Sequence, residues 1–485
     1  MIKKLFKSGY FKSLAILTSG SLIGALITAG TEVARTWIFP AELVGVCSFL
    51  IAFPHMFISI PSLRYDVSIV VEKDDRKSMA LVKLCFLLLV SVSAIVTVAY
   101  AIYIFVFHPD YTQYWYTIPL SYLVVCGYGL NNILNAYNNR NKEYGEISRR
   151  YVVRTAGQRI TALLIGVIVV VLLKLPQWSV LILYAPQGFG LYIGAWNQSR
   201  GIRTRAAELK SITWAEMWEV AKFHSKQADY SSPALFINSY SYTSITMQIE
   251  HLFDTTTLAY YSISNRVLGM PIALICGNVA KVYIEEAAKE YNATGKFIKA
   301  FRRTFLFLVA LAVPMFFAMR YLAPPVCELV LGKGWHVAGD YIKILALMFA
   351  FRLVGTALSQ SLAVCNRQGV ELIVNIGLVA ASLLSGLITR HVGGDIEFFL
   401  RCICMSRSLC YVGLITGVFL CARGSKKWVP AAVPAGEGAL TQAAPGEAIS
   451  EALSEEINEE ISEEISEESR AEEDCATEKE SIEHD

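Results

Sequence analysis

Three arginines lie deep inside long apolar stretches of the sequence, where charged side chains are rare: Arg266, Arg352 and Arg407. Arg266 stands about eight residues into the apolar run 258–281, roughly 12 Å deep at the helical rise per residue. An ionised side chain at such a depth costs on the order of 3 kcal/mol and usually faces a protein interior or a water-filled path. Because a guanidinium keeps its charge and binds phosphate oxygens with a planar fork, several arginines at mid-depth suit a diphosphate.

A structural role is the alternative for each of these arginines, and for Arg159, which has a similar position in another apolar run. Each would then pair with a buried acid or with backbone carbonyls and would only fix the packing of helices. Few acidic residues lie deep enough in the apolar runs to serve as such partners.

Carboxylates and a histidine stand near the ends of two apolar runs. Glu32 and Arg35 are one helical turn apart, so they can form an i, i+3 ion pair. Glu250, His251 and Asp254 cluster at the end of the seventh run. Such groups can relay H⁺ or Na⁺ and so couple transport to an ion gradient, or they can anchor helices at the membrane interface. We expect no cofactor and no metal site.

The elements that position these residues are membrane-spanning helices. The 485 residues are 54% hydrophobic and their mean hydropathy is +0.44, which is too apolar for a soluble protein. Apolar runs of about 17 to 25 residues are long enough to cross a bilayer. Twelve such runs are centred near residues 24, 52, 95, 126, 162, 186, 241, 269, 313, 352, 380 and 410. The sequence therefore predicts an all-α polytopic membrane protein with about twelve transmembrane helices.

Basic residues crowd the N-terminus and every second connection between these runs. One basic connection holds Arg149, Arg150 and Arg154, whereas the alternate connection "HPDYTQYWY" has no Lys or Arg. The positive-inside rule then places both termini in the cytoplasm. Without the acidic last sixty residues, the chain carries 39 basic and 23 acidic residues. That excess can meet anionic lipid headgroups or an anionic substrate.

The polar connection 197–229 divides six predicted spans from six. It contains a predicted amphipathic surface helix, "TWAEMWEVAKFHSKQ", with Trp214 and Trp218 one turn apart. A faint internal repeat aligns "FPAELVGVCS" with "FDTTTLAYYS", each at the turn after the first span of its half. We expect a six-helix bundle at 1–196, a cytoplasmic linker with an amphipathic helix at 197–229, a second six-helix bundle at 230–422, and a disordered acidic cytoplasmic tail at 423–485.

Several function classes are excluded by what the sequence does not contain. Its soluble segments are too short to house an enzyme domain, and it has no phosphate-cradling glycine loop, zincin helix or nucleophile elbow. We therefore expect neither an enzyme nor a nucleic-acid-binding protein. The amides in the fourth and seventh runs can bind sugar hydroxyls or neighbouring helices: Asn131, Asn132, Asn135, Asn138, Asn238 and Gln248.

At this point the sequence resembles the bacterial polysaccharide biosynthesis flippases, a family of the larger superfamily that contains the multidrug and toxin extruders. The similarity is carried by "SLAILTSGSLIGALI", "RTWIFPAELVGVCSF", "SLRYDVSIVVEKDD", "AYYSISNRVLGMPIALICGNVAKVYIEEAAK" and "LGKGWHVAGDYIKILALMFAFRLVGTALSQSLAVCNRQ". These stretches cover roughly residues 10–420 in the order and spacing of the family.

The resemblance implies twelve to fourteen helices in two lobes around a central cavity, and an undecaprenyl diphosphate oligosaccharide as substrate. Family-like motifs place Arg35, Arg64, Asp66 and Arg266 at matching positions, and Arg352 falls in a family-like stretch. The expected substrate-binding residues are Arg35, Arg64, Arg266, Arg352 and Arg407, and the candidates for ion coupling are Glu32, Glu250 and His251.

The expected function is flipping of lipid-linked repeat units across the bacterial inner membrane by alternating access, for O-antigen, capsule or exopolysaccharide synthesis. Expected partners are the lipid-linked oligosaccharide, membrane lipids, and the glycan polymerase and chain-length machinery. A small-molecule or multidrug exporter of the same superfamily is one alternative, although organic cations favour a cavity dominated by acids. A membrane glycan polymerase or ligase is another, although its catalytic groups need a larger outward loop. A scaffold without transport would leave the deep arginines unexplained.

Overall fold

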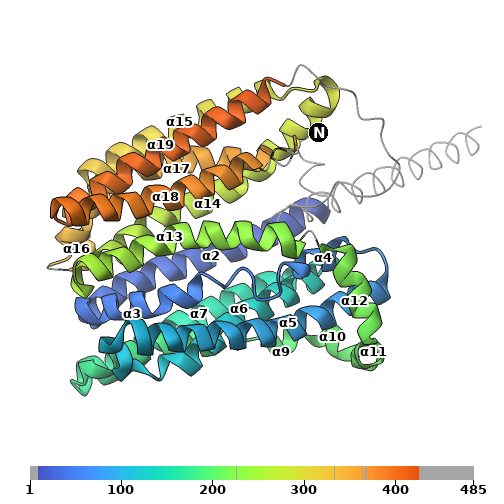
Figure 1. Cartoon of the computed structure of the whole chain (residues 1–485), viewed down its shortest axis with the longest axis horizontal. Coiled ribbons are helices and arrows are strands. Elements are labelled where there is room, and N and C mark those ends of the chain that lie inside the picture. The colour runs from blue at the N-terminus through green and yellow to red at the C-terminus, as the bar shows by residue number, and fades with distance from the viewer. Residues whose placement is uncertain are drawn as a thin grey trace, which may run out of the picture.

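The computed structural model describes residues 9–225, 227–332, 334–362, 364–365, 367 and 369–424, and these ranges fold into helices without a strand. Figure 1 shows the long helices lying side by side along the longest dimension of the molecule. Apart from its first two residues, the predicted acidic tail at 423–485 lies outside the described residues.

The first half of the chain holds six long or apolar helices and one short helix. Asp74 caps the N-terminus of the helix that begins at Asp75, because its side chain accepts hydrogen bonds from the backbone N–H groups of Arg76 and Lys77. Turns of π-helix extend two of them, through Phe107 and Leu172. The bounds are α2 Gly9–Ile38, α3 Ala41–His55, α4 Tyr65–Val71, α5 Asp75–Ile102, α6 Thr117–Arg140, α7 Tyr144–Gly166 and α8 Ser179–Phe189.

Four short helices connect the halves: α9 Ala195–Gln198, α10 Arg200–Thr204, α11 Ala206–Ser211 and α12 Trp214–Phe223. The second half then contains α13 Ser232–Leu252, α14 Thr255–Thr294, α15 Ile298–Tyr321, α16 Ala323–Leu331, α17 His336–Ser359, α18 Gly369–Val392 and α19 Ile396–Ala422. In Figure 1, α14, α15 and α17 to α19 lie above α13, α16 lies at the left end at the level of α13, and the helices of the first half lie below it.

The predicted spans correspond to separate helices. Each of the twelve predicted centres falls within its own helix, namely α2, α3, α5 to α8, α13 to α15 and α17 to α19. Within the described residues, seven helices are long and apolar enough to cross a membrane by length and composition, and α3 is a shorter apolar helix. Helix α13 is rich in Ser, Thr and Tyr, which lowers its hydropathy and supplies polar groups to the interior. The predicted all-α polytopic class is confirmed.

Small residues bring α2 and α7 close together. A Cβ atom added at Gly20 would lie 2.1 Å from Oγ of Ser148, and one added at Gly24 would lie 2.4 Å from the ring of Tyr151. The two glycines are four residues apart on one face of α2, a spacing that lets helices approach closely in membranes. Helices α2 and α7 therefore form a tightly packed pair.

The two halves meet at one end of the molecule, which we call the closed end and define by Thr36, Trp37, Gly45, Thr255, Val330 and Leu331. The hydroxyl of Thr36 and the indole N–H of Trp37 donate to the carbonyls of Leu331 and Val330, each at 2.9 Å. Gly45 lies against the carbonyl of Thr255, where an added Cβ would be 1.7 Å away. The distribution of basic residues predicts that this end faces outward.

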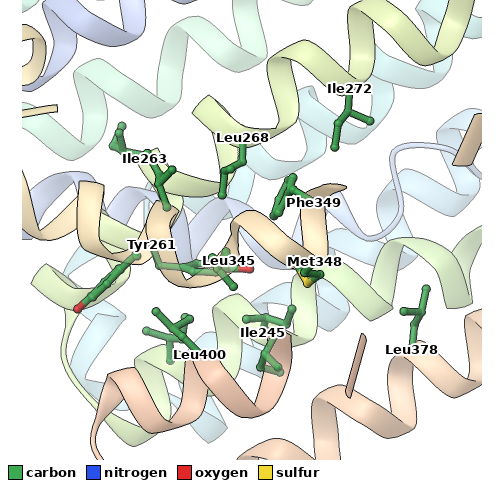
Figure 2. Packing of buried hydrophobic residues seen from close by; sticks show 14 of the residues in the cluster. Ile245, Tyr261, Ile263, Leu268, Ile272, Leu345, Met348, Phe349, Leu378 and Leu400 are labelled. Atoms are coloured by element: carbon green, nitrogen blue, oxygen red, sulfur yellow. The ribbon is translucent and has the colours of Figure 1, made fainter. Parts of the chain in front are cut away.

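The core of the second half is apolar. Figure 2 shows side chains of α13, α14, α17, α18 and α19 that converge, among them Ile245, Leu268, Phe349, Leu378 and Leu400, which are buried. Their removal from water and from lipid contact holds the helices in fixed positions through close packing. This packing supports the polar side chains described below.

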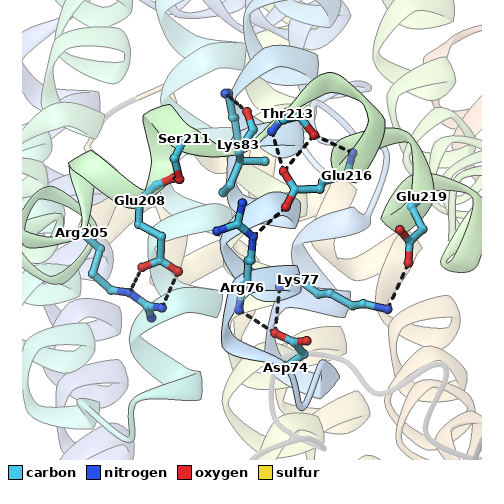
Figure 3. A network of polar contacts seen from close by, with 11 residues as sticks. Asp74, Arg76, Lys77, Lys83, Arg205, Glu208, Ser211, Thr213, Glu216 and Glu219 are labelled. Carbon is cyan, nitrogen blue, oxygen red and sulfur yellow. Dashed lines mark hydrogen bonds and ion pairs between the residues drawn. The ribbon is translucent and has the colours of Figure 1, made fainter.

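Polar contacts attach α12 to the beginning of α5 (Figure 3). Thr213 and Glu216 form a capping box at the start of α12. Nε of Arg76 donates to Glu216 at 2.6 Å, and this hydrogen bond lowers the pKa of Glu216 to about 2. Trp214 and Trp218 on the same helix are exposed, as an interfacial helix requires.

Candidate functional site

One group of charged side chains gathers around a single carboxylate. It consists of Glu32 and Arg35 on α2, Arg159 on α7 and Arg266 on α14, and we call it the Glu32 cluster. Oε1 of Glu32 accepts hydrogen bonds from Nη1 of Arg159 and from Nη1 of Arg266, the latter at 2.5 Å. Nη1 of Arg35 lies 3.6 Å from Oε2 of Glu32, so the i, i+3 pair that the sequence allows is present.

The Glu32 cluster carries an excess of positive charge. Three guanidinium groups share one carboxylate, and only 3% of Glu32 and 5% of Arg35 are exposed. Within the described part of the chain, Nε and Nη2 of Arg35 have no hydrogen-bond partner. Arg159 and Arg266 are half-buried. The cluster therefore retains about two uncompensated charges and reachable donors, which is the chemistry that an anionic group requires.

The Glu32 cluster also joins the two halves. Glu32 lies on a helix of the first half and Arg266 on a helix of the second half. Thr36, which contributes to the closed end, follows Glu32 by one helical turn. The charges therefore lie directly inside the closed end.

A second group of arginines shares one aromatic ring. Cζ of Arg352 on α17 lies 4.4 Å from the ring centroid of Tyr242 on α13, and Cζ of Arg407 on α19 lies 4.6 Å from it. The hydroxyl groups of Tyr242 and Tyr411 are hydrogen-bonded at 2.8 Å. We call Tyr242, Arg352, Arg407 and Tyr411 the Tyr242 cluster. The negative face of an aromatic ring attracts each cation, but it does not neutralise the charge.

Arg407 is fully buried and only partly satisfied. Its Nη1 donates to the carbonyl of Ser241 at 2.6 Å and to Oγ of Ser382 at 3.0 Å, so it connects α13, α18 and α19. Among the residues that the structure describes, its Nε and Nη2 have no hydrogen-bond partner, and neither has Nε of Arg352. No described carboxylate forms an ion pair with either arginine. The structural role that the sequence left open explains the hydrogen bonds of Nη1 of Arg407. It does not explain Nε and Nη2, which have no described partner.

Arg64 lies outside both clusters. It has the left-handed φ of 65° just before α4 begins, and its Nη1 is 3.9 Å from Oδ2 of Asp66. Asp66 in turn accepts a hydrogen bond from the hydroxyl of Ser62 at 2.6 Å. These contacts form a local turn, and no contact links Arg64 to the Glu32 cluster within the described ranges.

Glu250 and His251 are also separate from Glu32. Glu250 accepts a hydrogen bond from the hydroxyl of Tyr111 at 2.7 Å and lies 4.0 Å from Nδ1 of His108, both in the connection after α5. Burial lowers the pKa of His108, which disfavours a charged imidazole there. His251 is exposed. This arrangement is a further polar contact between the halves, and Glu250 has no arginine among its described ion-pair partners.

Sequence reasoning missed Tyr242 and Tyr411. The chain has 24 tyrosines, and nothing in their spacing distinguishes the two that meet the arginines. It also missed that Arg159 and Arg266 converge on Glu32, because 127 and 234 residues separate them from it. Only Arg35, which is three residues away, could be paired with Glu32 from the sequence.

The fold is shared with solved membrane transporters. The chain is similar to a structure of the lipid II flippase MurJ in an inward closed conformation, with a TM-score of 0.63 and 12% identity over 84% of this chain and 90% of that chain. It is similar to an outward-facing multidrug resistance MATE family transporter of the MOP superfamily, with a TM-score of 0.55 and 12% identity over 87% and 96%. A MOP superfamily transporter from Pyrococcus furiosus matches with a TM-score of 0.56 and 13% identity over 87% and 96%.

These TM-scores show that the chain has the fold of these multi-pass membrane transporters. No sequence among the curated proteins matches the chain. The model of a family described as "Polysaccharide biosynthesis protein" matches residues 43–340, more than half of the chain. The chain therefore belongs to the polysaccharide biosynthesis protein family, as the resemblance of its sequence implied.

Proposed function

We propose that this protein flips an undecaprenyl-diphosphate-linked oligosaccharide from the cytoplasmic to the outer leaflet of a bacterial inner membrane by alternating access. The observation that carries the proposal is the Glu32 cluster, in which three arginines share one buried carboxylate. A diphosphate headgroup supplies the negative charge that this cluster lacks. The family and the fold support transport of a lipid-linked glycan precursor, and the lipid II flippase is one protein with this fold.

The diphosphate would compete with Glu32 for the guanidinium of Arg266. When phosphate oxygens bind Arg266, the hydrogen bond between Glu32 and Arg266 is no longer needed to neutralise that charge. Because this hydrogen bond joins α2 to α14 beside the closed end, its loss favours separation of the halves there. Binding from the cytoplasmic side would thus promote opening on the outer side.

The Tyr242 cluster would serve as a second region of positive potential, within the second half of the protein, beside the path of the headgroup. Its guanidinium groups keep unpartnered nitrogens, and the ring of Tyr242 holds two like charges close together without a carboxylate. A polar path of this kind is required physically, since a charged headgroup cannot cross hydrocarbon unaided. The polyprenyl tail would stay in the lipid, and both termini would lie in the cytoplasm.

Complementation of a flippase-deficient bacterial strain tests the proposal. The wild-type chain should restore surface glycan and deplete lipid-linked repeat units from the cytoplasmic leaflet. Arg266→Ala and Arg352→Ala should insert at normal levels and lose most of this activity. Arg401→Ala is the matched control, because Arg401 is exposed and forms an ion pair with Glu397 on the preceding turn of the same helix.

Three other results would contradict the proposal. Full complementation by both arginine variants at normal expression would show that the arginines do not bind substrate. Export of cationic dyes by a wild-type protein that never restores surface glycan would favour a small-molecule exporter. Accumulation of unpolymerised repeat units on the outer face in cells lacking the protein would favour a polymerase.

A further inference from the structure

A cavity of about 110 Å³ lies among α2, α6 and α7, apart from both arginine clusters. Its polar lining includes Ser21 on α2, Asn131 and Asn135 on α6, and Arg150, Tyr151 and Arg154 on α7. The volume accommodates several groups of the size of a water molecule. No acidic side chain lines it. The cavity combines neutral hydrogen-bonding groups with positive charge.

The two asparagines present complementary groups. Nδ2 of Asn131 donates to the carbonyls of Gly127 and Leu191, at 2.6 and 3.2 Å, so its oxygen is left as an acceptor. Oδ1 of Asn135 accepts a hydrogen bond from Gln198 at 2.8 Å, so its amide N–H groups are left as donors. One acceptor and one donor side by side suit the hydroxyl groups of a sugar, each of which both donates and accepts.

The two arginines of the cavity differ in what they can offer. Arg150 donates through its three nitrogens to the carbonyls of Ile193 and Leu191 and to the side chain of Gln198, so it adds charge but few free donors. Arg154 has no ion pair with a described residue, and its Nε is buried without a partner there. Its guanidinium lies 5.4 Å from the ring centroid of Tyr151. Arg154 is therefore the group that can bind an anion.

We propose that this cavity binds an acidic sugar residue, with its carboxylate at Arg154 and its hydroxyl groups at Asn131 and Asn135. The role of such a site in transport rests on the proposed function, because the acidic sugar would belong to the glycan of the lipid-linked substrate. Ser21 precedes Glu32 by eleven residues, about 16 Å along α2. The diphosphate and the sugar of one extended substrate would thus contact different parts of α2.

The test measures binding of monosaccharides to the full-length protein in nanodiscs of zwitterionic lipid. Saturation-transfer difference NMR would measure the binding of glucuronate and of glucose directly, and the binding of inorganic phosphate through its displacement of glucuronate. Glucuronate should bind at least about tenfold more tightly than glucose, since a charge-assisted hydrogen bond is added, and more tightly than phosphate, which lacks the hydroxyl contacts. Equal binding of glucuronate and glucose, or equal binding of glucuronate and phosphate, would overturn the proposal without any variant.

Variants of α7 locate the effect. Arg154→Gln should reduce glucuronate binding to the level of glucose, and Arg154→Lys should keep part of the preference. Arg149→Gln is the matched control, because Arg149 is exposed on the same helix and pairs with Glu146. Its glucuronate binding should equal that of the wild type. Unchanged binding in a folded Arg154→Gln protein would place the sugar elsewhere and overturn the proposal.

The outcome is distinguishable from that of the proposed function. If the wild type fails to complement a flippase-deficient strain but binds glucuronate through Arg154, the flippase proposal falls and the sugar site stands. If complementation succeeds while glucuronate has no preference over glucose, the sugar site falls and the flippase proposal stands.

Discussion

Glu32 and Arg266, which are 234 residues apart in the sequence, are joined by a 2.5 Å hydrogen bond between the two halves of the protein. The same carboxylate oxygen also accepts a hydrogen bond from Arg159 within the first half. A single buried carboxylate therefore pairs with one arginine of its own half and with one arginine of the other half.

Glu32→Gln should destabilise the protein, because it removes the one carboxylate that pairs with these three arginines among the described residues. Removal of one partner from a buried ion pair costs about 3 kcal/mol or more. The thermal unfolding temperature in detergent should therefore fall clearly. Glu397→Gln, which removes an exposed i, i+4 pair with Arg401, should change stability by less than about 1 kcal/mol. Equal effects of the two substitutions would show that the Glu32 cluster does not stabilise the fold.

Arg407→Met should leave thermal stability unchanged or raise it, while transport is lost. The substitution removes two hydrogen bonds, but it also removes a fully buried charge with two unpartnered nitrogens. Arg401→Met on the exposed side of the same helix should affect neither property. A large loss of stability in Arg407→Met would instead assign Arg407 to holding α13, α18 and α19 together.

Tyr242→Phe and Tyr242→Leu should differ in their effect on transport. Phenylalanine keeps the ring that faces Arg352 and Arg407 and loses only the hydrogen bond to Tyr411. Leucine removes both cation–π contacts, each worth roughly 1 to 2 kcal/mol when desolvated. Complementation should be mildly reduced in the first variant and severely reduced in the second. Similar activity in both would show that the ring does not position the arginines.

Gly45→Ala should disturb the closed end. Its new Cβ would meet the carbonyl of Thr255, a backbone atom that cannot rotate away, and overpacking of this kind costs about 1 to 3 kcal/mol. Gly30→Ala on α2 meets nothing within 4 Å and serves as the control. Limited proteolysis and thermal unfolding of purified protein should be altered in the first variant only. Wild-type behaviour of Gly45→Ala would show that α3 and α14 are not tightly apposed.

Thr213→Ala should loosen α12 from α5. Loss of the N-cap costs about 1 kcal/mol, and hydrogen exchange should accelerate in α12 while α5 keeps its protection.

The contact between Arg76 and Glu216 should depend on pH only in the acidic range. Because Arg76 lowers the pKa of Glu216 from 4.5 to about 2, the contribution of this contact is complete above pH 4.5 and is lost as the pH falls through about 2. Protection of α12 should therefore be constant from pH 5 to pH 8, after correction for intrinsic exchange rates. A decline within that range would contradict the assignment.

The sequence was sufficient to predict the helices, because apolar runs of membrane length are a direct consequence of the thickness of the bilayer. The sequence was not sufficient to predict the partners of the deep arginines. Arg266 and Arg159 contact Glu32 only after α2, α7 and α14 have packed, and no local spacing of residues indicates these contacts. Arg150 and Arg154 were interpreted as charges of a connection, whereas α7 already begins at Tyr144 and carries both into the cavity beside Asn131.

The close packing of Gly20 and Gly24 against α7 determines which partner Glu32 keeps. We expect so tightly packed a pair of helices to move together, which would keep Glu32 on α2 paired with Arg159 on α7, whereas Arg266 lies on α14. Any rearrangement that parts the halves therefore changes the coordination of Glu32 from three guanidinium groups to two. The contact between Glu32 and Arg266 would then be one of the interactions that favour the closed end, and an anionic ligand that binds Arg266 more tightly when the halves are apart would shift the equilibrium towards opening.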